Sequence, residues 1–430
     1  MSERKKPSTD PYKGVRDFYP QDQFVQRYLF EHMERVCELF GYEEYNASVL
    51  EPAELYRSKT SEEIINEQTY TFTDRGDREV TLRPEMTPTF ARMVAARIRE
   101  IPMPSRWYSI ANFFRYDRTQ KGRLREFWQL NADIVGAAGI EADAEVIALS
   151  HAIMRAMGAE ERDFEVRVSD RRILDAIYNN VGLSLEMHAV VTRLLDKRAK
   201  VDDIEKLLAE AIDHPTTAKK LLAELERTTS TAYLENLRGQ LELMGVHNMV
   251  VDTQTTRGFD YYTGMVFELF DTHEDNRRSL AGGGRYDNLL SMFSSGGASI
   301  SPGGGGSIPA VGFAMGDVTA RDFLEAHDLL PEYVPATELM ICVVEPECLT
   351  HAQKLAQDLR REDVAAAINF SGKRIGDQIR QADKMKVPFI IAIGSKERLE
   401  GRYTIKNLAS GDERTVSADK IADHLFSSLG

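Results

Sequence analysis

The stretch RGFDYYTGMVFE, residues 257–268, sets polar groups into a segment that otherwise has the composition of a β-strand. Phe259, Tyr261 and the run 265–267 make it aromatic-rich, which is typical of extended backbone. Arg257 adds a planar cation that is always charged, close to a carboxylate and two adjacent phenols. A sheet carrying these groups suits a site for a phosphate and a small polar ligand. A half-exposed strand with a ladder of aromatic side chains would show the same composition.

A second region, residues 106–136, is predicted to form a strand, a basic loop and another strand. The second strand alternates, so its apolar and polar side chains take opposite faces. Its apolar face carries Trp128, Leu130, Ala132 and Ile134, and its polar face carries Gln129, Asn131 and Asp133. An antiparallel strand with one solvated face would alternate in the same way.

The loop between these strands concentrates positive charge on a chain whose formal net charge is −14. Its cations are Arg115, Arg118, Lys121, Arg123 and Arg125. Such a cluster on an acidic chain indicates a polyanionic ligand, such as a nucleotide or the end of a nucleic acid. A solvated hairpin tip is the alternative. Two phenylalanines directly before Arg115 weaken that alternative, because they place this arginine at the end of a buried strand.

Length and composition predict a globular protein of two or three domains. The N-terminal segment has no apolar run, so we expect no signal peptide and no membrane span there. Cys37, Cys342 and Cys348 are too few and too scattered for a disulfide framework or a zinc site, which indicates a reducing cytoplasm. Cys37 falls in a helix pattern and Cys342 in a strand pattern, so we expect these two thiols to be buried. The nine histidines show no metal-binding spacing, and no metal site is expected from them.

Four further segments indicate how the chain is organised. Residues 22–40 have the pattern of an amphipathic helix closed by Gly41. Residues 164–250 are helical and charged in composition, which also suits a solvated surface. The run 294–310 is rich in Gly, Ser and Pro, and it indicates a surface loop or a mobile flap. From Glu338 onward strands and helices alternate, which predicts a small α/β domain with a mostly parallel sheet.

Together these motifs resemble those of histidyl-tRNA synthetases, which are class II aminoacyl-tRNA synthetases. Segment 113–127 is similar to the second class-defining motif, and segments 257–268 and 282–290 are similar to the two histidine-specific motifs. Segment 81–92 matches the part of the family that holds the amino acid. The resemblance runs from residue 14 into the C-terminal domain, and the pairing of the two histidine-specific motifs makes it highly specific.

The resemblance implies an α+β catalytic domain with a mixed, mainly antiparallel sheet, a helical insertion and a C-terminal α/β domain. The expected catalytic core comprises residues 1–165 and 251–330, and the insertion between them, residues 166–250, leans toward the acceptor arm of tRNA. Residues 338–430 would read the anticodon. The family also implies a homodimer, built through the first helix and the strand after it.

For the amino acid, the resemblance implies that Glu85 takes the α-ammonium of L-histidine, since a carboxylate is the natural partner of that cation. The other side chains that would hold histidine are Thr87, Gln129, Asp133, Tyr261 and Tyr262. A pocket that hydrogen-bonds both imidazole nitrogens rejects apolar analogues strongly, because its own polar groups would be left unpaired.

For ATP, the resemblance implies that Arg115 holds the α-phosphate and the histidine carboxylate, while Arg257 approaches this phosphate from the opposite side. Arg123 would also bind ATP. Mg²⁺ is expected on the pyrophosphate oxygens, bound mainly through ATP rather than through a protein cage. The implied reaction forms histidyl-adenylate and then transfers histidine to the terminal ribose of tRNA(His). It needs positioning and charge stabilisation, and no covalent enzyme intermediate.

Two positions depart from the family pattern. The third class-defining motif usually ends in an arginine that stacks on adenine, and this chain has Thr319 there. Arg321 lies two residues further on, where a helix turns it roughly 200° away. Either another cation supplies the adenine contact or the affinity for ATP is lower. The first motif usually carries a proline at the dimer interface, where this chain has Ser48, with Pro52 four residues later.

Two other functions share parts of this pattern. Some paralogues of the family do not charge tRNA, and instead act as histidine sensors that regulate the first enzyme of histidine biosynthesis. They usually lack the C-terminal domain, whereas this chain has one and keeps Glu85, Arg115, Gln129 and Arg257. Synthetases of the glycyl or prolyl type share the fold but lack RGFDYYTG, the motif that sets the amino acid. The sequence therefore favours histidine ligation over histidine sensing.

Overall fold

In the computed structural model the chain divides into two compact units, residues 1–331 and 332–430. The structure describes residues 8–57, 68–120, 122–196, 201, 203–227, 230–252, 261–276, 278–293 and 307–429. Each unit has a β-sheet and a hydrophobic core of its own.

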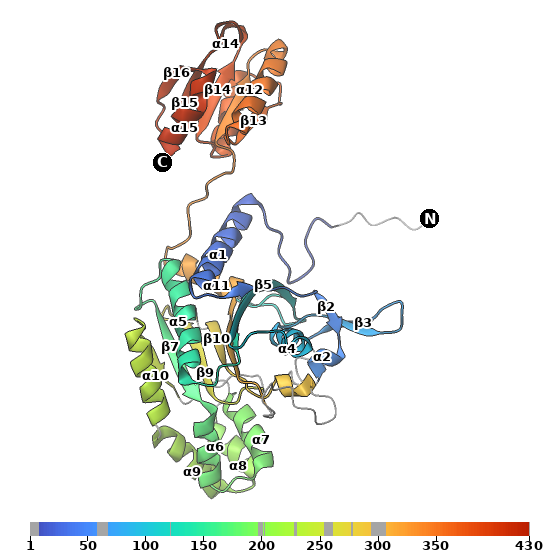
Figure 1. Ribbon diagram of the computed structural model, residues 1–430, viewed down its shortest axis with the longest axis vertical. Coiled ribbons are helices and arrows are strands. Elements are labelled where there is room, and N and C mark those ends of the chain that lie inside the picture. The colour runs from blue at the N-terminus through green and yellow to red at the C-terminus, as the bar shows by residue number, and fades with distance from the viewer. Residues whose placement is uncertain are drawn as a thin grey trace. The chain divides into compact units, whose positions relative to one another are not determined.

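The first unit is built on an eight-stranded sheet with the strand order β1-β5-β6-β11-β10-β9-β7-β8 (Figure 1). Its strands are β1 (Glu43–Glu44), β5 (Ser105–Phe114), β6 (Glu126–Val135), β7 (Phe164–Asp170), β8 (Met249–Val251), β9 (Met265–Asp271), β10 (Ser279–Arg285) and β11 (Ala310–Gly316). The outermost pairs, β1 with β5 and β7 with β8, are parallel, and every pair between them is antiparallel. The expected mixed, mainly antiparallel sheet is confirmed.

Three helices cover one face of this sheet: α1 (Pro20–Leu39), α5 (Ile140–Ala156) and α11 (Asp317–Ala326) (Figure 1). Leu29 of α1 belongs to the same hydrophobic core as Leu130 and Ile134 of β6. Burying one such side chain stabilises the fold by about 1.5–3 kcal/mol. The apolar side of the alternating pattern in β6 therefore packs under helices, which leaves the polar side for the other face.

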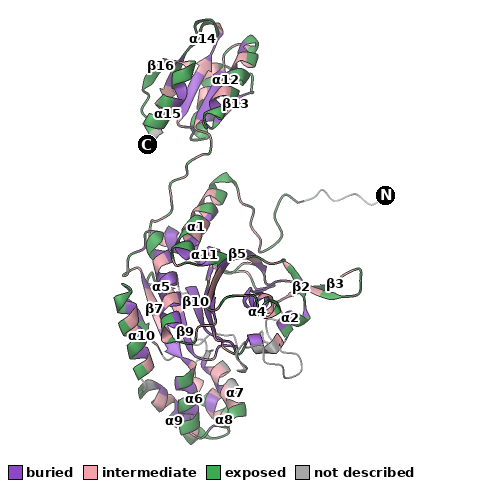
Figure 2. Ribbon diagram, in the orientation of Figure 1, coloured by how far each residue is buried: buried purple, intermediate pink, exposed green. Residues whose placement is uncertain are grey.

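The other face of the sheet is partly covered by α4 (Thr87–Ala96). Phe90 and Val94 of this helix form a second core with Tyr261 and Tyr262. Next to α4 lie α2 (Glu54–Arg57) and a three-stranded sheet of β2 (Leu50–Pro52), β4 (Glu79–Leu82) and β3 (Tyr70–Thr73). Figure 2 shows the change from buried strands at the centre of the main sheet to exposed residues on β3.

A group of helices lies between β7 and β8 in the chain: α6 (Arg171–Asn180), α7 (Leu185–Asp196), α8 (Ile204–Ile212), α9 (Pro215–Arg227) and α10 (Ala232–Leu243). Side-chain oxygens of Asp170, Asp203 and Thr231 cap the first turns of α6, α8 and α10. The helical part begins at Arg171, because residues 164–170, predicted within or just before the insertion, form strand β7 of the main sheet.

The second unit is a five-stranded sheet with the order β13-β12-β14-β15-β16. Its strands are β12 (Leu339–Val343), β13 (Ala366–Asn369), β14 (Phe389–Ile393), β15 (Arg402–Asn407) and β16 (Glu413–Ser417), and its helices are α12 (Leu349–Arg361), α13 (Ile375–Lys384), α14 (Ser395–Glu400) and α15 (Ile421–Leu429). Helices cover both faces of this sheet, with Leu355 and Leu425 packed on one face and Ala382 on the other. Strands that are buried on both faces need apolar residues at every position, which explains the continuous apolar runs of β12 and β14. The predicted parallel strands are present, and β15 and β16 add an antiparallel pair.

Candidate active site

A cavity of about 370 Å³ lies against the polar face of β6. Its lining comes from three parts of the chain, residues 85–133, 261–282 and 312–319. The adjacent strands β6, β10 and β11 contribute Asn131, Gly282 and Gly312 to it. The motifs singled out in the sequence therefore meet in one place, although they lie far apart along the chain.

Glu85 and Tyr261 form the first polar pair in this cavity. The hydroxyl of Tyr261 donates to Oε2 of Glu85 at 3.3 Å, and the side chains are 6% and 3% exposed, respectively. Glu85 stands just before α4, and Thr87, the first residue of that helix, is also buried in the lining. A carboxylate held in this way at the wall of a cavity is suited to an ammonium ligand.

Asp133 and Tyr286 form the second polar pair. The hydroxyl of Tyr286 donates to Oδ1 of Asp133, and both side chains are almost completely buried. Burial raises the pKa of Asp133 to about 7, although the phenol works in the opposite direction. Oδ2 of Asp133 has no hydrogen-bond partner among the described residues. Tyr286 lies in the motif of residues 282–290, yet sequence reasoning gave it no role.

The carboxylate of Asp133 fits only because its cross-strand neighbour is a glycine. Gly312 of β11 pairs with Asp133, and a Cβ at this glycine would lie 2.0 Å from Oδ1 of Asp133. Real Cβ contacts do not approach this distance, so a side chain here would displace the carboxylate.

Gln129 and Asn131 complete the polar face of β6. Both line the cavity with Asp133, and Nε2 of Gln129 donates to Oδ1 of Asn131 at 2.8 Å. The three polar side chains predicted to share one face of this strand do so. The side-chain oxygen of Gln129 is available to a ligand in the cavity.

Arg115 enters the cavity at the end of β5. Its Nε donates to the carbonyl oxygen of Pro84 at 2.9 Å, and its guanidinium lies 5.3 Å from the centre of the Phe127 ring. Burial lowers its pKa, while the nearby carboxylates of Glu85 and Asp117 act in the opposite direction. An arginine remains charged under these conditions, so the cavity holds a fixed cation.

The other cations of the basic loop separate in the structure. Arg123 lines the cavity and forms an ion pair of 3.1 Å with the buried carboxylate of Asp117. Arg125 instead lies over the ring of Tyr116 at 3.9 Å. Arg118 is exposed, and Lys121 is outside the described residues. The concentration of charge located the loop, and the family resemblance had named Arg115 and Arg123, the two loop cations that line the cavity among the described residues.

Tyr262 is buried beside Tyr261, at 4.9 Å between ring centres, and also lines the cavity. Its backbone carbonyl accepts a hydrogen bond of 3.0 Å from Nη1 of Arg171, the first residue of α6. The helical insertion thus holds the segment that carries the two tyrosines. Arg257, predicted on the α-phosphate, is outside the described residues, and so are residues 294–306 of the predicted loop or flap.

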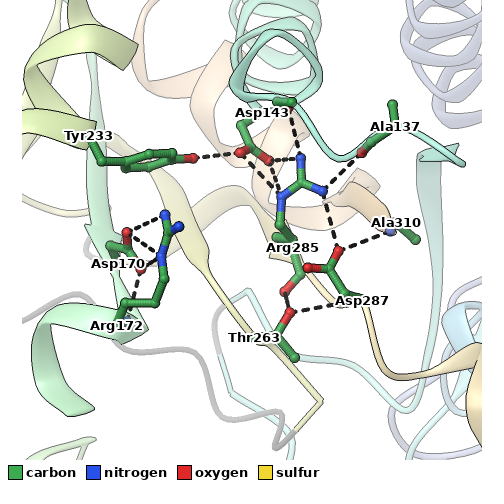
Figure 3. A network of polar contacts seen from close by, with 10 residues as sticks. Ala137, Asp143, Asp170, Arg172, Tyr233, Thr263, Arg285, Asp287 and Ala310 are labelled. Carbon is green, nitrogen blue, oxygen red and sulfur yellow. Dashed lines mark hydrogen bonds and ion pairs between the residues drawn. The ribbon is translucent and has the colours of Figure 1, made fainter. Parts of the chain in front are cut away.

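Arg285, from the second histidine-specific motif, does not line the cavity and instead forms the centre of a polar network beside it (Figure 3). Its buried guanidinium forms an ion pair of 2.7 Å with Asp143 of α5. Tyr233 of α10 donates to the same carboxylate at 2.5 Å. Because Thr263 donates its backbone N–H to the carbonyl of Arg285 at 2.7 Å, this network connects α5, the insertion and the tyrosine segment.

Thr319, which stands where the third motif usually has an arginine, lies in the first turn of α11. Thr319 is buried, with its hydroxyl 3.5 Å from the carbonyl of Leu280 and 3.4 Å from that of Gly316. Arg321 forms an ion pair of 3.0 Å with Asp22 of α1. It points away from the cavity, as helical geometry predicted. Arg278, which sequence reasoning missed, does line the cavity.

Three further features of the described residues concern metal ligands, membrane-spanning helices and disulfides. Among the described residues, no group of three or more His, Cys, Asp and Glu side chains is arranged to hold a metal ion. No helix in the described ranges is long and apolar enough to cross a membrane. All three cysteines are free and buried, which confirms the prediction of buried thiols.

Comparison with known proteins decides the family. A family model described as histidyl-tRNA synthetase matches residues 14–317, and one described as anticodon binding domain matches residues 338–426. The chain belongs to the histidyl-tRNA synthetase family. The resemblance inferred from the motifs is confirmed, and the second compact unit is the part that matches the anticodon binding domain.

Curated members of the histidyl-tRNA synthetase family match almost the whole chain. A histidine–tRNA ligase of Leptospira biflexa serovar Patoc is 38% identical over 427 residues, which cover 95% of each chain. One of Halorubrum lacusprofundi is 36% identical over 438 residues, which cover 96% of each chain. The crystal structure of histidyl-tRNA synthetase from Nostoc sp. PCC 7120 has the same fold, with a TM-score of 0.76, 22% identity, and coverage of 98% of this chain and 100% of that chain.

Proposed function

We propose that this chain ligates L-histidine to tRNA(His) at the expense of ATP, through a histidyl-adenylate intermediate. The observation that carries the proposal is that two buried carboxylates, Glu85 and Asp133, share one cavity with the guanidinium of Arg115. Zwitterionic histidine has an ammonium, an imidazole N–H and a carboxylate, which complement these three side chains in charge and hydrogen bonding. Full-length similarity to histidine–tRNA ligases supports the same reaction.

In the proposed pocket, Glu85 takes the α-ammonium, with Thr87 beside it. The hydrogen bond from Tyr261 fixes the carboxylate of Glu85 before the ligand arrives, which reduces the cost of ordering it on binding. Arg115 takes the carboxylate of histidine. The two ends of the amino acid are then held by groups on the segments before α4 and after β5, which are joined by the bond from Arg115 to the Pro84 carbonyl.

The imidazole ring would lie toward Asp133, bordered by Tyr261 and Tyr262. Oδ2 of Asp133 accepts one ring N–H, and Gln129 lies on the same strand face. A ligand that lacks this N–H leaves a buried carboxylate unpaired, which typically costs 10⁴-fold or more in specificity. The pocket therefore rejects an apolar analogue of similar size.

In the first step, the histidine carboxylate attacks the α-phosphorus of ATP and releases pyrophosphate. Arg115 and Arg257 would hold the α-phosphate from opposite sides, and Arg123 the phosphates beyond it. These cations stabilise the negative charge that develops on the phosphorus oxygens. Mg²⁺ supplies further charge neutralisation on the pyrophosphate, and we expect it to bind mainly through ATP, since this ion keeps most of its water and favours substrate phosphates.

In the second step, the terminal ribose hydroxyl of tRNA(His) attacks the carbonyl of the adenylate. Residues 338–430 would read the anticodon, which agrees with the anticodon binding domain model that matches this unit. The helical insertion, residues 166–250 in the sequence and helical from Arg171, would approach the acceptor arm. The catalytic core would be formed by residues 1–165 and 251–330.

The same proposal includes a homodimer that acts in the cytoplasm. Leu50 of β2 and Phe72 of β3, the strands on either side of β4, are 42% and 48% exposed, and an interface over the small sheet would cover them. Sedimentation at micromolar protein concentration tests this part, and a single species at the mass of one chain would contradict it.

The first experiment is ATP–pyrophosphate exchange with purified protein and each of the amino acids in turn, without tRNA. Exchange that requires histidine is expected, followed by histidylation of tRNA(His) when the tRNA is added. Exchange with a different amino acid would contradict the pocket assignment. Histidine binding without any exchange would instead assign the chain to the histidine-sensing paralogues.

A further inference from the structure

The first turn of α11 forms one wall of the cavity but contributes no cation to it. Asp317, Val318 and Thr319 line this wall. Thr319 is short and buried, and Arg321 is engaged with Asp22 outside the cavity. Any flat ligand group that lies beside this helix must find its cationic partner on another element.

Arg278 is a cation that lines the cavity close to the first turn of α11. It precedes β10 directly, is partly buried, and lines the cavity. Its guanidinium forms no hydrogen bond or ion pair with the described residues, whereas Arg123 is paired with Asp117 and Arg115 is bonded to a carbonyl. Burial lowers the pKa of Arg278 and the nearby cation of Arg123 adds to this effect, while the carboxylates of Asp117 and Asp322 act in the opposite direction. A partly buried cation without a partner is unfavourable unless a ligand supplies one.

The geometry brings Arg278 next to the position of the missing arginine. A Cβ at Gly122 would lie 2.6 Å from Cδ of Arg278 and 3.6 Å from Cγ2 of Thr319. The Arg278 side chain therefore passes between the basic loop and the first turn of α11. Gly122 has a φ of +70°, so both its backbone and the space above it require glycine. The contact of Thr319 with the Leu280 carbonyl keeps α11 against the start of β10.

The surroundings of Arg278 suit a nucleobase better than a phosphate. Leu124, Leu280 and Val318 each lie within two residues of Gly122, Arg278 or Thr319, and each lines the cavity. Apolar side chains around a planar cation fit the face of an aromatic ring, since a guanidinium stacks on π systems. A phosphate would instead favour several converging donors, and the nearby Arg123 is already paired with Asp117.

We propose that Arg278 stacks on the adenine ring of ATP and takes the place of the arginine that is absent at Thr319. This inference rests on the proposed function, because it assumes that ATP is the nucleotide. In the family pattern the cation stands at position 319, on the helix after β11, whereas here it would be Arg278, directly before β10. Both positions line the same part of the cavity. The chain then keeps a cationic nucleobase contact without an arginine at position 319.

The test compares Arg278→Ala and Arg278→Lys with Arg321→Ala, a matched control whose arginine faces α1. Arg278→Ala should raise KM for ATP in pyrophosphate exchange by about 10-fold, the scale of a partly desolvated cation–π contact, and should leave KM for histidine unchanged. The Lys variant should lie between Ala and wild type, and Arg321→Ala should match wild type. An unchanged KM for ATP in folded Arg278→Ala, as judged by circular dichroism and melting temperature, would overturn the inference.

Two further measurements identify the group that Arg278 contacts. Adenosine affinity, measured by calorimetry, should fall in Arg278→Ala, while competition by inorganic tripolyphosphate should not change. An equal loss for both probes would assign Arg278 to the phosphates and overturn the base contact. The double variant Arg278→Ala, Thr319→Arg should recover most of the ATP affinity. A folded double variant with no recovery would show that the two positions do not serve the same contact.

Failure of this inference can be told apart from failure of the proposed function. If wild-type protein shows no histidine-dependent exchange, the proposed reaction fails, but adenosine binding still reports on Arg278. If wild-type protein exchanges normally and Arg278→Ala behaves like it, the proposed reaction stands and the role of Arg278 fails.

Discussion

Replacing Tyr286 with phenylalanine removes the hydroxyl that donates to the buried carboxylate of Asp133. Both side chains are 2% exposed, so bulk water does not reach the lost bond. Oδ2 of Asp133 already has no partner among the described residues. Without the Tyr286 hydroxyl, no described side chain would donate a hydrogen bond to the ionised carboxylate. Because a hydrogen bond to a charged group contributes about 1.5–3 kcal/mol, we expect a stability loss of that size where Asp133 is ionised.

The loss should depend on pH in a defined direction. Burial raises the pKa of Asp133 from its ordinary value of about 4 to about 7, so the stability that this group contributes is fully present below about pH 4 and is lost as the pH rises through about 7. Removing the phenol raises the folded pKa further, which makes ionisation more costly. The melting temperature of Tyr286→Phe should therefore fall below that of wild type by more at about pH 8.5 than at about pH 5.

Scanning calorimetry at both pH values measures this difference, and pyrophosphate exchange should show KM for histidine raised by about 10-fold or more. Tyr42→Phe is the matched control, because Tyr42 is 3% exposed and its hydroxyl has no hydrogen-bond partner in the described part of the chain. This control should cost little at either pH. Equal losses for Tyr286→Phe at the two pH values, or a loss no larger than that of the control, would refute the reasoning.

Three other substitutions or deletions test separate parts of the proposal. Arg257→Ala should abolish adenylate formation and leave the fold intact, and a near-normal rate of pyrophosphate exchange would contradict its role on the α-phosphate. Removing residues 338–430 should impair charging of tRNA more than pyrophosphate exchange, whereas an equal loss in both assays would count against a separate anticodon-reading unit. Gly312→Ala should destabilise the protein and abolish exchange, because its Cβ would lie 2.0 Å from Asp133; the control Gly376→Ala, whose Cβ would meet nothing within 4 Å, should be tolerated.

The parts of the fold that the sequence predicted are those that depend on local pattern. The alternation in residues 126–135 identified both faces of β6, because side chains of a strand alternate with a period of two. The strand and helix order after Glu338 was visible because short apolar runs alternate there with amphipathic helical segments. The antiparallel pair β15 and β16 was not predicted, because β15 alternates over only four residues and β16 has no buried residue.

The parts of the site that the sequence did not predict depend on distant contacts. Tyr286 binds Asp133, a residue 153 positions away, and no local pattern reveals that pair. Arg278 stands in a segment of ordinary polar composition, so only the structure shows that it lines the cavity. Arg285 was quoted within its motif, and its ion pair with Asp143 explains why a cation is needed there although it touches no ligand.

The position of β6 in the main sheet has a consequence for synthesis of the protein. One neighbour, β5, is made immediately before it, but the other, β11, begins at Ala310, about 175 residues after the end of β6. At roughly 5–20 residues per second, the ribosome takes about 10–35 s to deliver that neighbour. During this interval β6 is an edge strand with unpaired amide groups, and α11, which packs on it, has not yet been made, so the strand is a template for aggregation. Yield from rapid expression should therefore fall as the concentration of nascent chains rises, and the exposed edge is the strand that carries Gln129 and Asp133.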